Sequence, residues 1–239
     1  MAPLTVLISV YAGERTCWLK ESLRSIFSQT LRASEVLLLE DGPLTDELDK
    51  VVSFFQSLYP ELRVICYPEN RGLGKTLNDG LLECKNEIVA RMDSDDISIP
   101  ERFEVEYNWL VRHPDYSLVG SWTNEFSGLT KNIRSQRKVP EDFLQIIQYA
   151  KRRCPVNHPT VMFRKSAVLD AGGYLTKYFP EDYFLWIRML QRGDKFYNIQ
   201  RSLLFFRFSQ KVINRRGGWR YAKDEALVQY HIYQIGFIT

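Results

Sequence analysis

Three aspartates within four residues, Asp93, Asp95 and Asp96, carry the most chemical information in the sequence. Carboxylates this close repel one another unless a cation or hydrogen-bond donors compensate their charge. An all-oxygen ligand set without His or Cys suits Mg²⁺ or Mn²⁺, which keep water ligands and share their shell with substrate phosphates. The stretch therefore predicts a divalent metal site. The alternative interpretation is a helix N-cap at Asp95 or Asp96, shortly before Pro100.

Further polar residues stand where four predicted strands end. Short apolar runs alternate with helical patterns, which predicts a parallel sheet with helices on both faces. Ligands of such sheets bind beyond the carboxyl ends of the strands. The predicted strands are Leu4–Val10, Glu35–Leu39, Leu62–Tyr67 and Glu87–Met92, and the predicted helices are Glu14–Gln29, Asp46–Tyr59 with Thr45 as N-cap, and Gly74–Cys84. The polar residues at the strand ends are Tyr11, Glu14, Glu40, Asp41, Glu69, Asn70, Arg71, Asp93, Ser94, Asp95 and Asp96.

The segment 70–76 ends in Gly-Lys-Thr and invites a phosphate-loop interpretation. A Walker A motif requires glycine where Glu69 stands, and a Rossmann fingerprint requires a third glycine where Leu77 stands. Both motifs are therefore excluded. The segment is either a helix start that attracts anions or a plain β–α turn.

After Pro100 the pattern becomes irregular, and no polar linker divides the chain. The expected strands are Ser117–Phe126, Leu129–Val139, Thr160–Arg164, Phe196–Ile199 and Leu203–Phe208. The expected helices run from Pro100 to about Arg112, over Glu141–Arg152, over a short stretch closed by Gly172-Gly173, over Glu181–Gln191 and over Trp219–Ile235. We expect one domain with a regular first half and an irregular second half.

The composition excludes several classes of protein. With 239 residues, of which 45% are hydrophobic, the chain can form a globular core and is not disordered. No apolar run approaches the ~18 residues of a membrane-spanning helix, and no signal peptide is visible. The four cysteines and three histidines lack the spacing of zinc ligands. Without a disulfide framework, a reducing compartment fits, and we expect a cytoplasmic protein.

The net charge of +3 is unevenly distributed. Residues 131–153 contain seven basic and two acidic side chains, and so do residues 200–239, which leaves −7 for the rest. Two basic segments indicate an anionic partner, although solvated helix faces explain them equally well. No nucleic-acid-binding motif accompanies them, so we expect no nucleic-acid partner.

A series of motifs runs through nearly the whole chain in a fixed order. They are Val6–Tyr11 with Glu14, Ser25–Thr30, Glu35–Gly42, Asn70–Gly74 with Asn78 and Gly80, Arg91–Asp96, His158-Pro159-Thr160, Gly172-Gly173-Tyr174 and Glu181-Asp182. Together they resemble the family 2 glycosyltransferases, in the branch that builds bacterial capsule, exopolysaccharide or O-antigen. The resemblance implies a GT-A (Rossmann-like) α/β fold with three α/β/α layers, a mostly parallel central sheet and a single domain over residues 1–239. About 1–99 would bind the nucleotide sugar and about 100–239, with the C-terminal basic helix, the acceptor.

The resemblance also implies roles for individual residues. Asp41 matches the aspartate that contacts the nucleotide base, and Asp93 and Asp95 match the D-x-D pair that binds the diphosphate through Mn²⁺ or Mg²⁺. Asp182 matches the catalytic base, although an acid at a helix N-terminus gives the same pattern. The remaining residues expected at the nucleotide sugar are Tyr11, Glu14, Asn70, Gly72, Asn78 and Arg91. Ala12 and Glu40 replace a frequent Asn and Asp of the family, which leaves the base preference open.

Weaker candidates are expected at the acceptor or the diphosphate. His158 is either an acceptor residue or a structural histidine, and Trp186 either stacks on the acceptor or belongs to the core. Glu181 precedes the expected base. Arg215 and Arg216 would clamp the leaving diphosphate, contact anionic lipid or remain solvated.

The expected function is inverting transfer of a sugar from a UDP-sugar to a hydroxyl of a growing lipid-linked surface polysaccharide. The acceptor would then be a carbohydrate on polyprenyl diphosphate. A peripheral position on the inner face of the cytoplasmic membrane would follow. Two alternatives are a sugar-phosphate nucleotidyltransferase, whose N-terminal G-x-G-T loop is missing at Val10–Arg15, and a non-catalytic module that binds polyanions or membrane surfaces.

Overall fold

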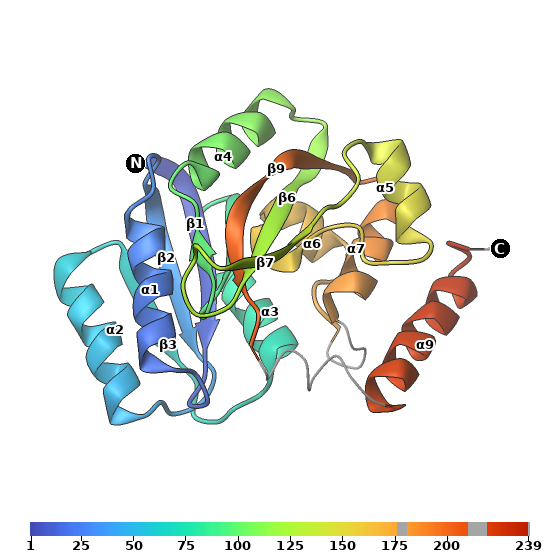
Figure 1. Ribbon diagram of the computed structural model, residues 1–239. Coiled ribbons are helices and arrows are strands. Elements are labelled where there is room, and N and C mark those ends of the chain that lie inside the picture. Colours follow the sequence, from blue (N-terminus) through green and yellow to red (C-terminus); the bar gives the residue numbers. More distant parts are fainter. Residues whose placement is uncertain (176–180, 210–218, 239) are drawn as a thin grey trace.

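One mixed sheet of nine strands runs through the molecule, in the order β3-β2-β1-β4-β8-β6-β9-β5, with β7 added on β6 (Figure 1). The computed structural model describes residues 1–175, 181–209 and 219–238. The strands are β1 (Ala2–Val10), β2 (Ala33–Glu40), β3 (Leu62–Cys66), β4 (Ile88–Asp93), β5 (Ile97–Ser98), β6 (Tyr116–Phe126), β7 (Ile133–Arg137), β8 (Met162–Arg164) and β9 (Lys195–Arg207). Parallel pairs join β3-β2-β1-β4 and also β6 with β9, and antiparallel pairs bring in β8, β7 and β5.

Helices cover both faces of this sheet, which gives three α/β/α layers (Figure 1). The helices are α1 (Thr16–Phe27), α2 (Asp46–Leu58), α3 (Leu73–Glu83), α4 (Arg102–Arg112), α5 (Phe143–Ala150), the 3₁₀ turn η1 (His158–Thr160), α6 (Lys165–Asp170), α7 (Glu181–Gln191) and α9 (Trp219–Gln234). Successive residues of a strand point to opposite faces. Leu4, Val6 and Ile8 of β1 accordingly join the core under α1, α2 and α4. Leu7 joins the core under α3, α5, α6, α7 and α9.

The elements expected in the first half of the chain are confirmed to within two residues. The predicted cap of α2 is present, since the Thr45 hydroxyl accepts a hydrogen bond from the Leu48 amide at 3.4 Å. The alternative that Asp95 or Asp96 caps a helix is wrong. The two-residue strand β5 follows these aspartates, and α4 begins only at Arg102.

The second half shows larger differences from the expectation. The two strands expected at 196–199 and 203–208 are one strand, β9, whose pairing with β6 is shifted around Trp122. This irregularity breaks the alternation of apolar residues, so the sequence pattern divides the strand falsely. Strand β7 is shorter than expected, and β8 enters antiparallel between β4 and β6.

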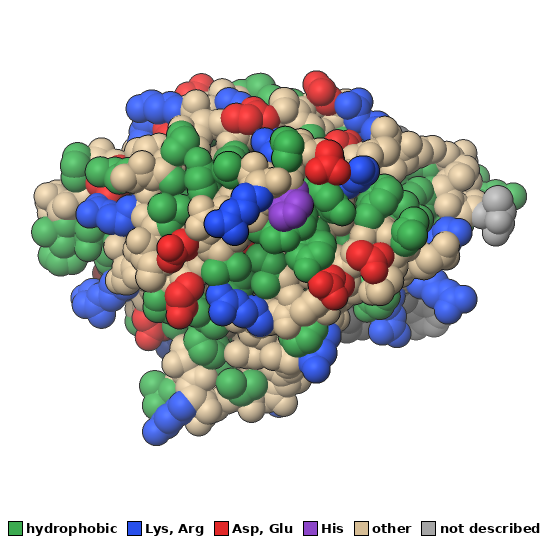
Figure 2. All heavy atoms as spheres, turned by 90° about the horizontal axis from the view of Figure 1, so that it is seen from above, with side chains coloured by type: hydrophobic (Ala, Val, Ile, Leu, Met, Phe, Trp, Pro, Cys, Tyr) green, Lys and Arg blue, Asp and Glu red, His purple; other side chains and the backbone are tan. Residues whose placement is uncertain are grey.

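The carboxyl ends of β1, β2, β3 and β4 share one edge of the sheet because these strands are parallel. In Figure 1 this edge lies at the bottom, where the chain also enters α7. Figure 2 shows the opposite end of the molecule, where acidic and basic side chains are interspersed among apolar ones without a large area of one sign. No helix in the described parts of the chain combines the length and apolarity that crossing a membrane requires.

Candidate functional site

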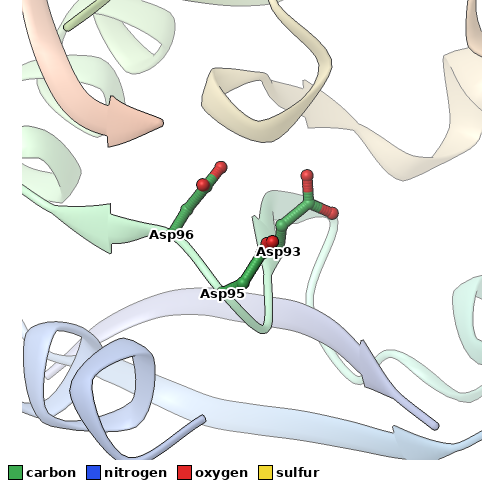
Figure 3. Close-up of side chains that lie close together, drawn as sticks. All are labelled: Asp93, Asp95 and Asp96. Carbon is green, nitrogen blue, oxygen red and sulfur yellow. The ribbon is translucent and has the colours of Figure 1, made fainter. Parts of the chain in front are cut away.

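The turn from β4 to β5 brings three carboxylates together (Figure 3). Asp93, Asp95 and Asp96 each offer an oxygen, and these oxygens lie within 4.8 Å of one another. Burial, followed by the charges of Asp93 and Glu14, raises the pKa of Asp95 to about 7. Burial, followed by the charges of Asp95 and Asp93, raises the pKa of the fully buried Asp96 well above its usual range. The protein alone therefore compensates this negative charge only in part.

This turn fits a hard divalent cation. The ligand atoms are all carboxylate oxygens, and Asp96 Oδ2 is buried without a hydrogen-bond partner in the described part of the chain. A cation at the turn would satisfy that oxygen and remove the repulsion that raises the two pKa values. The sequence predicts Asp93 and Asp95 as ligands, and the structure adds Asp96 to the set.

Two buried arginines hold the turn in place. The Arg91 guanidinium, 1% exposed, donates to Asp93 Oδ1 at 2.5 Å. Its expected contact with the nucleotide sugar stays a prediction. Arg207 at the end of β9 donates its backbone amide to Asp96 Oδ1 (2.8 Å) and its Nε to the carbonyl of Asp95 (2.7 Å). The sequence analysis misses Arg207 because its partners lie 111 or more residues away.

The loop after β1 is hydrogen-bonded to the turn that holds Asp93, Asp95 and Asp96, which we call the metal turn for its proposed role. Glu14 Oε2 accepts a hydrogen bond from the Ser94 hydroxyl at 2.7 Å, and Ser22 of α1 donates to the carbonyl of Asp93 at 2.9 Å. Tyr11 is 45% exposed, and its ring lies against Gly13, where a Cβ atom would come within 2.4 Å of it. An exposed ring beside the turn is suited to stacking on a nucleotide base.

Asp41 at the end of β2 fixes the loop that begins α3. Its carboxylate accepts hydrogen bonds from the amides of Arg71 (2.8 Å) and Gly72 (3.1 Å) and from the Thr76 hydroxyl (2.8 Å). The Asn70 side chain donates to the Asp41 carbonyl at 3.1 Å. The segment 70–76 is thus a β–α turn held by Asp41. Its contact with a nucleotide base stays a prediction.

Gly42 lets the ends of β2 and β3 approach closely. Its φ of +86° is in the left-handed region, and a Cβ atom there would lie 2.7 Å from the Asn70 amide nitrogen. Only glycine avoids both penalties. This contact places Asn70 and Gly72 next to Asp41, as the sequence predicts for residues of one binding edge.

Asn78 connects α3 to the turn after α6. Its amide oxygen accepts from the Tyr174 amide at 2.7 Å, and its Nδ2 donates to the Tyr174 carbonyl. The Tyr174 hydroxyl lies 3.0 Å from Nε2 of His158, which belongs to η1. Directly after η1, the carbonyl of Val161 accepts a hydrogen bond from the amide of Arg91 in β4, at 2.9 Å. Asn78 therefore holds Tyr174, and through it His158, in place. Both the oxygen and the nitrogen of its side-chain amide are used in hydrogen bonds to the Tyr174 backbone.

Trp186 belongs to the core behind His158. Its side chain is fully buried, and its ring lies 6.0 Å from the ring of His158 and 6.1 Å from that of Phe196. Stacking of Trp186 on an acceptor is therefore wrong for this structure, because no part of the ring faces solvent. The core alternative accounts for it.

Asp182 stands in the first turn of α7 and is half-buried. The thiol of Cys154 lies 3.8 Å from Asp182 Oδ2 and donates to it, and burial together with the Asp182 charge raises the pKa of this thiol. The thiol therefore stays protonated and orients the carboxylate. Glu181 begins α7, but its side chain, and Arg215 and Arg216 as a whole, lie outside the described residues.

Residues 5–171 match the sequence model of glycosyl transferase family 2. The chain belongs to this family. The matched region holds Asp41 and the metal turn and ends before Asp182. Membership in a glycosyltransferase family decides against the nucleotidyltransferase and the non-catalytic module.

Relatives of this glycosyltransferase act in bacterial surface polysaccharide synthesis. It is 36% identical to the UDP-Gal:alpha-D-GlcNAc-diphosphoundecaprenol beta-1,3-galactosyltransferase of Escherichia coli, over 98% of this chain and 85% of the relative. It is 38% identical to the amylovoran biosynthesis glycosyltransferase AmsE of Erwinia amylovora, over 98% and 88%. An uncharacterized glycosyltransferase of Haemophilus influenzae is 39% identical, over 92% and 82%.

Solved structures confirm the GT-A fold of the glycosyltransferase. TarS of S. aureus (residues 1–349, in complex with UDP-GlcNAc) superimposes with a TM-score of 0.73 at 16% identity, over 94% of this chain and 65% of that one. The mannosyltransferase PcManGT of Pyrobaculum calidifontis, in complex with GDP-Man and Mn²⁺, gives 0.66 at 16% identity, over 95% and 69%. At these identities the likeness concerns the fold.

Proposed function

We propose that this glycosyltransferase transfers a sugar from a UDP-sugar, with inversion and with the help of Mn²⁺ or Mg²⁺, to a hydroxyl of a lipid-linked surface polysaccharide. The observation that carries the proposal is the convergence of Asp93, Asp95 and Asp96 at the carboxyl edge of the sheet, with one buried oxygen left unpaired. The names of the E. coli and Erwinia relatives support the acceptor class. The UDP-GlcNAc and Mn²⁺ named in the two structural neighbours support the donor and the metal.

The residues divide the work between donor and acceptor. Asp93 and Asp95, with Asp96, would hold a divalent cation, which neutralises the charge that develops on the departing diphosphate. Tyr11 and the loop held by Asp41 would bind the nucleoside. The acceptor hydroxyl attacks the anomeric carbon as the bond to the diphosphate breaks, and Asp182 takes the hydroxyl proton. A single displacement without an enzyme nucleophile inverts the anomeric centre.

The donor half of this proposal is tested by calorimetry of UDP binding with and without Mn²⁺. We expect Mn²⁺ to strengthen UDP binding, and Asp95→Asn to abolish that gain because the metal loses a charged ligand. Asp79→Asn changes a half-buried acid that pairs with Arg71 and Lys75; it is the matched control and should keep the gain. UDP binding that is independent of Mn²⁺ in the wild-type protein would contradict the metal assignment.

The acceptor half is tested with a panel of UDP-sugars and lipid diphosphate sugars, in which product anomers are assigned by NMR. We expect transfer with inversion, and slow hydrolysis of the donor when no acceptor is added. A product that retains the donor configuration would overturn the single displacement.

We further propose that the protein works on the inner face of the cytoplasmic membrane, in peripheral contact with it. The undecaprenol-linked acceptor in the name of the E. coli relative supports this location, because such a lipid holds the acceptor at a membrane. Cell fractionation tests it: we expect the protein in the membrane fraction, released by high salt. Exclusive recovery in the supernatant at low salt would contradict membrane contact.

A further inference from the structure

The basic segment 131–153 concentrates seven cations in 23 residues, and none of them forms an ion pair in the described part of the chain. In the described part of the chain, nine Lys or Arg side chains outside this segment form ion pairs, and none of the seven inside it does. Its two acids have other partners: Glu141 accepts from the Tyr197 hydroxyl at 2.6 Å, and Asp142 caps α5. The segment therefore keeps an excess of positive charge for an external anion.

One end of β7 in this segment lies beside the metal turn. Ile133 pairs with Phe126 of β6, and the guanidinium of Arg207 lies 4.6 Å from the Phe126 ring. Arg207 is the residue that holds Asp95 and Asp96. Arg134 is exposed at this end of β7, with its guanidinium 5.1 Å from the ring of Phe208.

The other end of β7 lies beside the expected catalytic base. Arg137 donates from Nη2 to the carbonyl of Cys154 at 3.4 Å, and the thiol of Cys154 contacts Asp182 at 3.8 Å. Lys138 follows directly and is exposed, 4.8 Å from the ring of Trp122. These contacts connect one end of β7 to the surroundings of the metal turn and the other end to the surroundings of the base, and Figure 1 shows β7 in front of the sheet. An acceptor whose hydroxyl reaches Asp182 has this strand along its path.

We propose that β7 binds the diphosphate of the acceptor through Arg134, Arg137 and Lys138, with Lys131 at its edge. This inference rests on the proposed glycosyl transfer and adds the place where the acceptor's charged group is held. A neutral sugar hydroxyl needs no cations, whereas a diphosphate is recognised by guanidinium and ammonium groups whose hydrogen bonds are charge-assisted. The donor diphosphate has its own proposed cation site at the carboxylates 93–96, which leaves the cations of β7 for the acceptor.

The test uses undecyl diphosphate as the probe, below its micelle concentration, with the donor site saturated by UDP and Mn²⁺. Calorimetry compares the wild-type protein with the triple variant Arg134→Gln, Arg137→Gln, Lys138→Gln. We expect the wild type to bind the probe and the variant to bind it roughly tenfold more weakly or worse, since charge-assisted hydrogen bonds are lost. Undecyl glucoside, which carries no charge, should show no difference between the two proteins.

Matched controls separate this result from misfolding and from failure of the proposed function. The triple variant Arg32→Gln, Arg192→Gln, Lys195→Gln removes three cations that are already paired and should bind the probe like the wild type. UDP binding with Mn²⁺ must be equal in all three proteins, which shows that they are folded. Donor hydrolysis by the wild-type protein without acceptor tests the enzymatic function separately.

Three outcomes would overturn the inference. They are a wild type that does not bind undecyl diphosphate, a β7 variant that binds it unchanged, and an equal loss in the paired-cation control. Vesicles of phosphatidylglycerol and phosphatidylcholine distinguish the lipid headgroup as the source of phosphate. If the β7 variant loses only vesicle binding and keeps its affinity for undecyl diphosphate, the surface binds headgroups and the inference is wrong.

Discussion

The acidic turn at 93–96 and the basic strand β7 both gather charges of one sign, but the protein treats the two groups differently. The acids are buried or half-buried and braced by Arg91 and Arg207, so their geometry is set before a ligand arrives. The cations of β7 are mostly exposed and have no carboxylate partners in the described part of the chain. Buried carboxylates require a compact cation at fixed distances. The exposed cations of β7 are solvated and can bind a larger, mobile anion.

The largest effect expected from this division is on catalysis at the acceptor side. Asp182→Asn should lower turnover by roughly two to four orders of magnitude, because no group then takes the acceptor proton. Mn²⁺-dependent UDP binding should be unchanged, since Asp182 is not among the carboxylates that converge on the metal turn. Single-turnover kinetics and calorimetry measure the two quantities separately.

The control for this change is Asp170→Asn. Asp170 is an exposed acid at the end of α6 that pairs with Arg192. This substitution should leave turnover and donor binding as in the wild type. If Asp182→Asn weakens UDP binding as much as it slows turnover, the division into a donor side and an acceptor side is wrong.

The next effect concerns the brace of the acidic turn. Arg207→Gln should lower the free energy of unfolding by about 2 to 3 kcal/mol, because the Asp95 carbonyl and the partly buried Glu21 pair lose their donor. It should also weaken Mn²⁺ binding, since Asp95 and Asp96 are no longer held together. Urea unfolding and metal titration measure these changes.

Arg201→Gln removes an exposed arginine of the same strand and is the matched control. It should change the free energy of unfolding by less than about 0.5 kcal/mol. An Arg207 variant with normal stability and normal Mn²⁺ affinity would show that Arg207 does not hold the acidic turn in place. The proposed difference in rigidity between this turn and β7 would then be wrong.

A smaller effect is expected at the loop held by Asp41. Asp41→Asn leaves one acceptor oxygen where the Arg71 and Gly72 amides and the Thr76 hydroxyl need two, which costs about 1 to 3 kcal/mol of stability. UDP affinity should fall with it, since Asn70 and Gly72 shift. Thermal unfolding and UDP calorimetry test this, and unchanged values in both would refute the positioning role.

The smallest effect is the response to salt. Rising ionic strength should increase KM for a diphosphate acceptor several-fold, because exposed cations are screened, and should change KM for the donor less, because the buried turn is screened less. Steady-state kinetics at low and high ionic strength measure both constants. If KM for the acceptor and KM for the donor depend equally on salt, the proposed contrast between the rigid acidic turn and the solvated cations of β7 is wrong.

Much of the donor side was predictable because its residues follow regular elements. The ends of β1, β2, β3 and β4 are visible as apolar runs, and parallel strands put their carboxyl ends on one edge. Asp93 and Asp95 could therefore be placed together without coordinates. The burial of Arg91 behind Asp93 could not be predicted, since it depends on packing against other elements.

The acceptor side was less predictable because long-range contacts define it. Trp186 has the same local pattern whether it faces the core or the acceptor, and only the packing of α7 against η1 and β9 buries it. The pairing of Cys154 with Asp182 joins residues 28 apart through a loop without a motif. No sequence motif near these residues predicts either contact.

By itself the sequence determined the α/β class, the family, and the edge of the sheet where the acids meet, because these follow from periodicity and from residues adjacent in the chain. The tertiary structure decided which buried charges are compensated. Arg207 reaches Asp96 across 111 residues, Asp96 joins Asp93 and Asp95 in one cluster of carboxylates, and the cations of β7 form no ion pair in the described part of the chain. Compensation depends on distance and burial, and a linear pattern records neither.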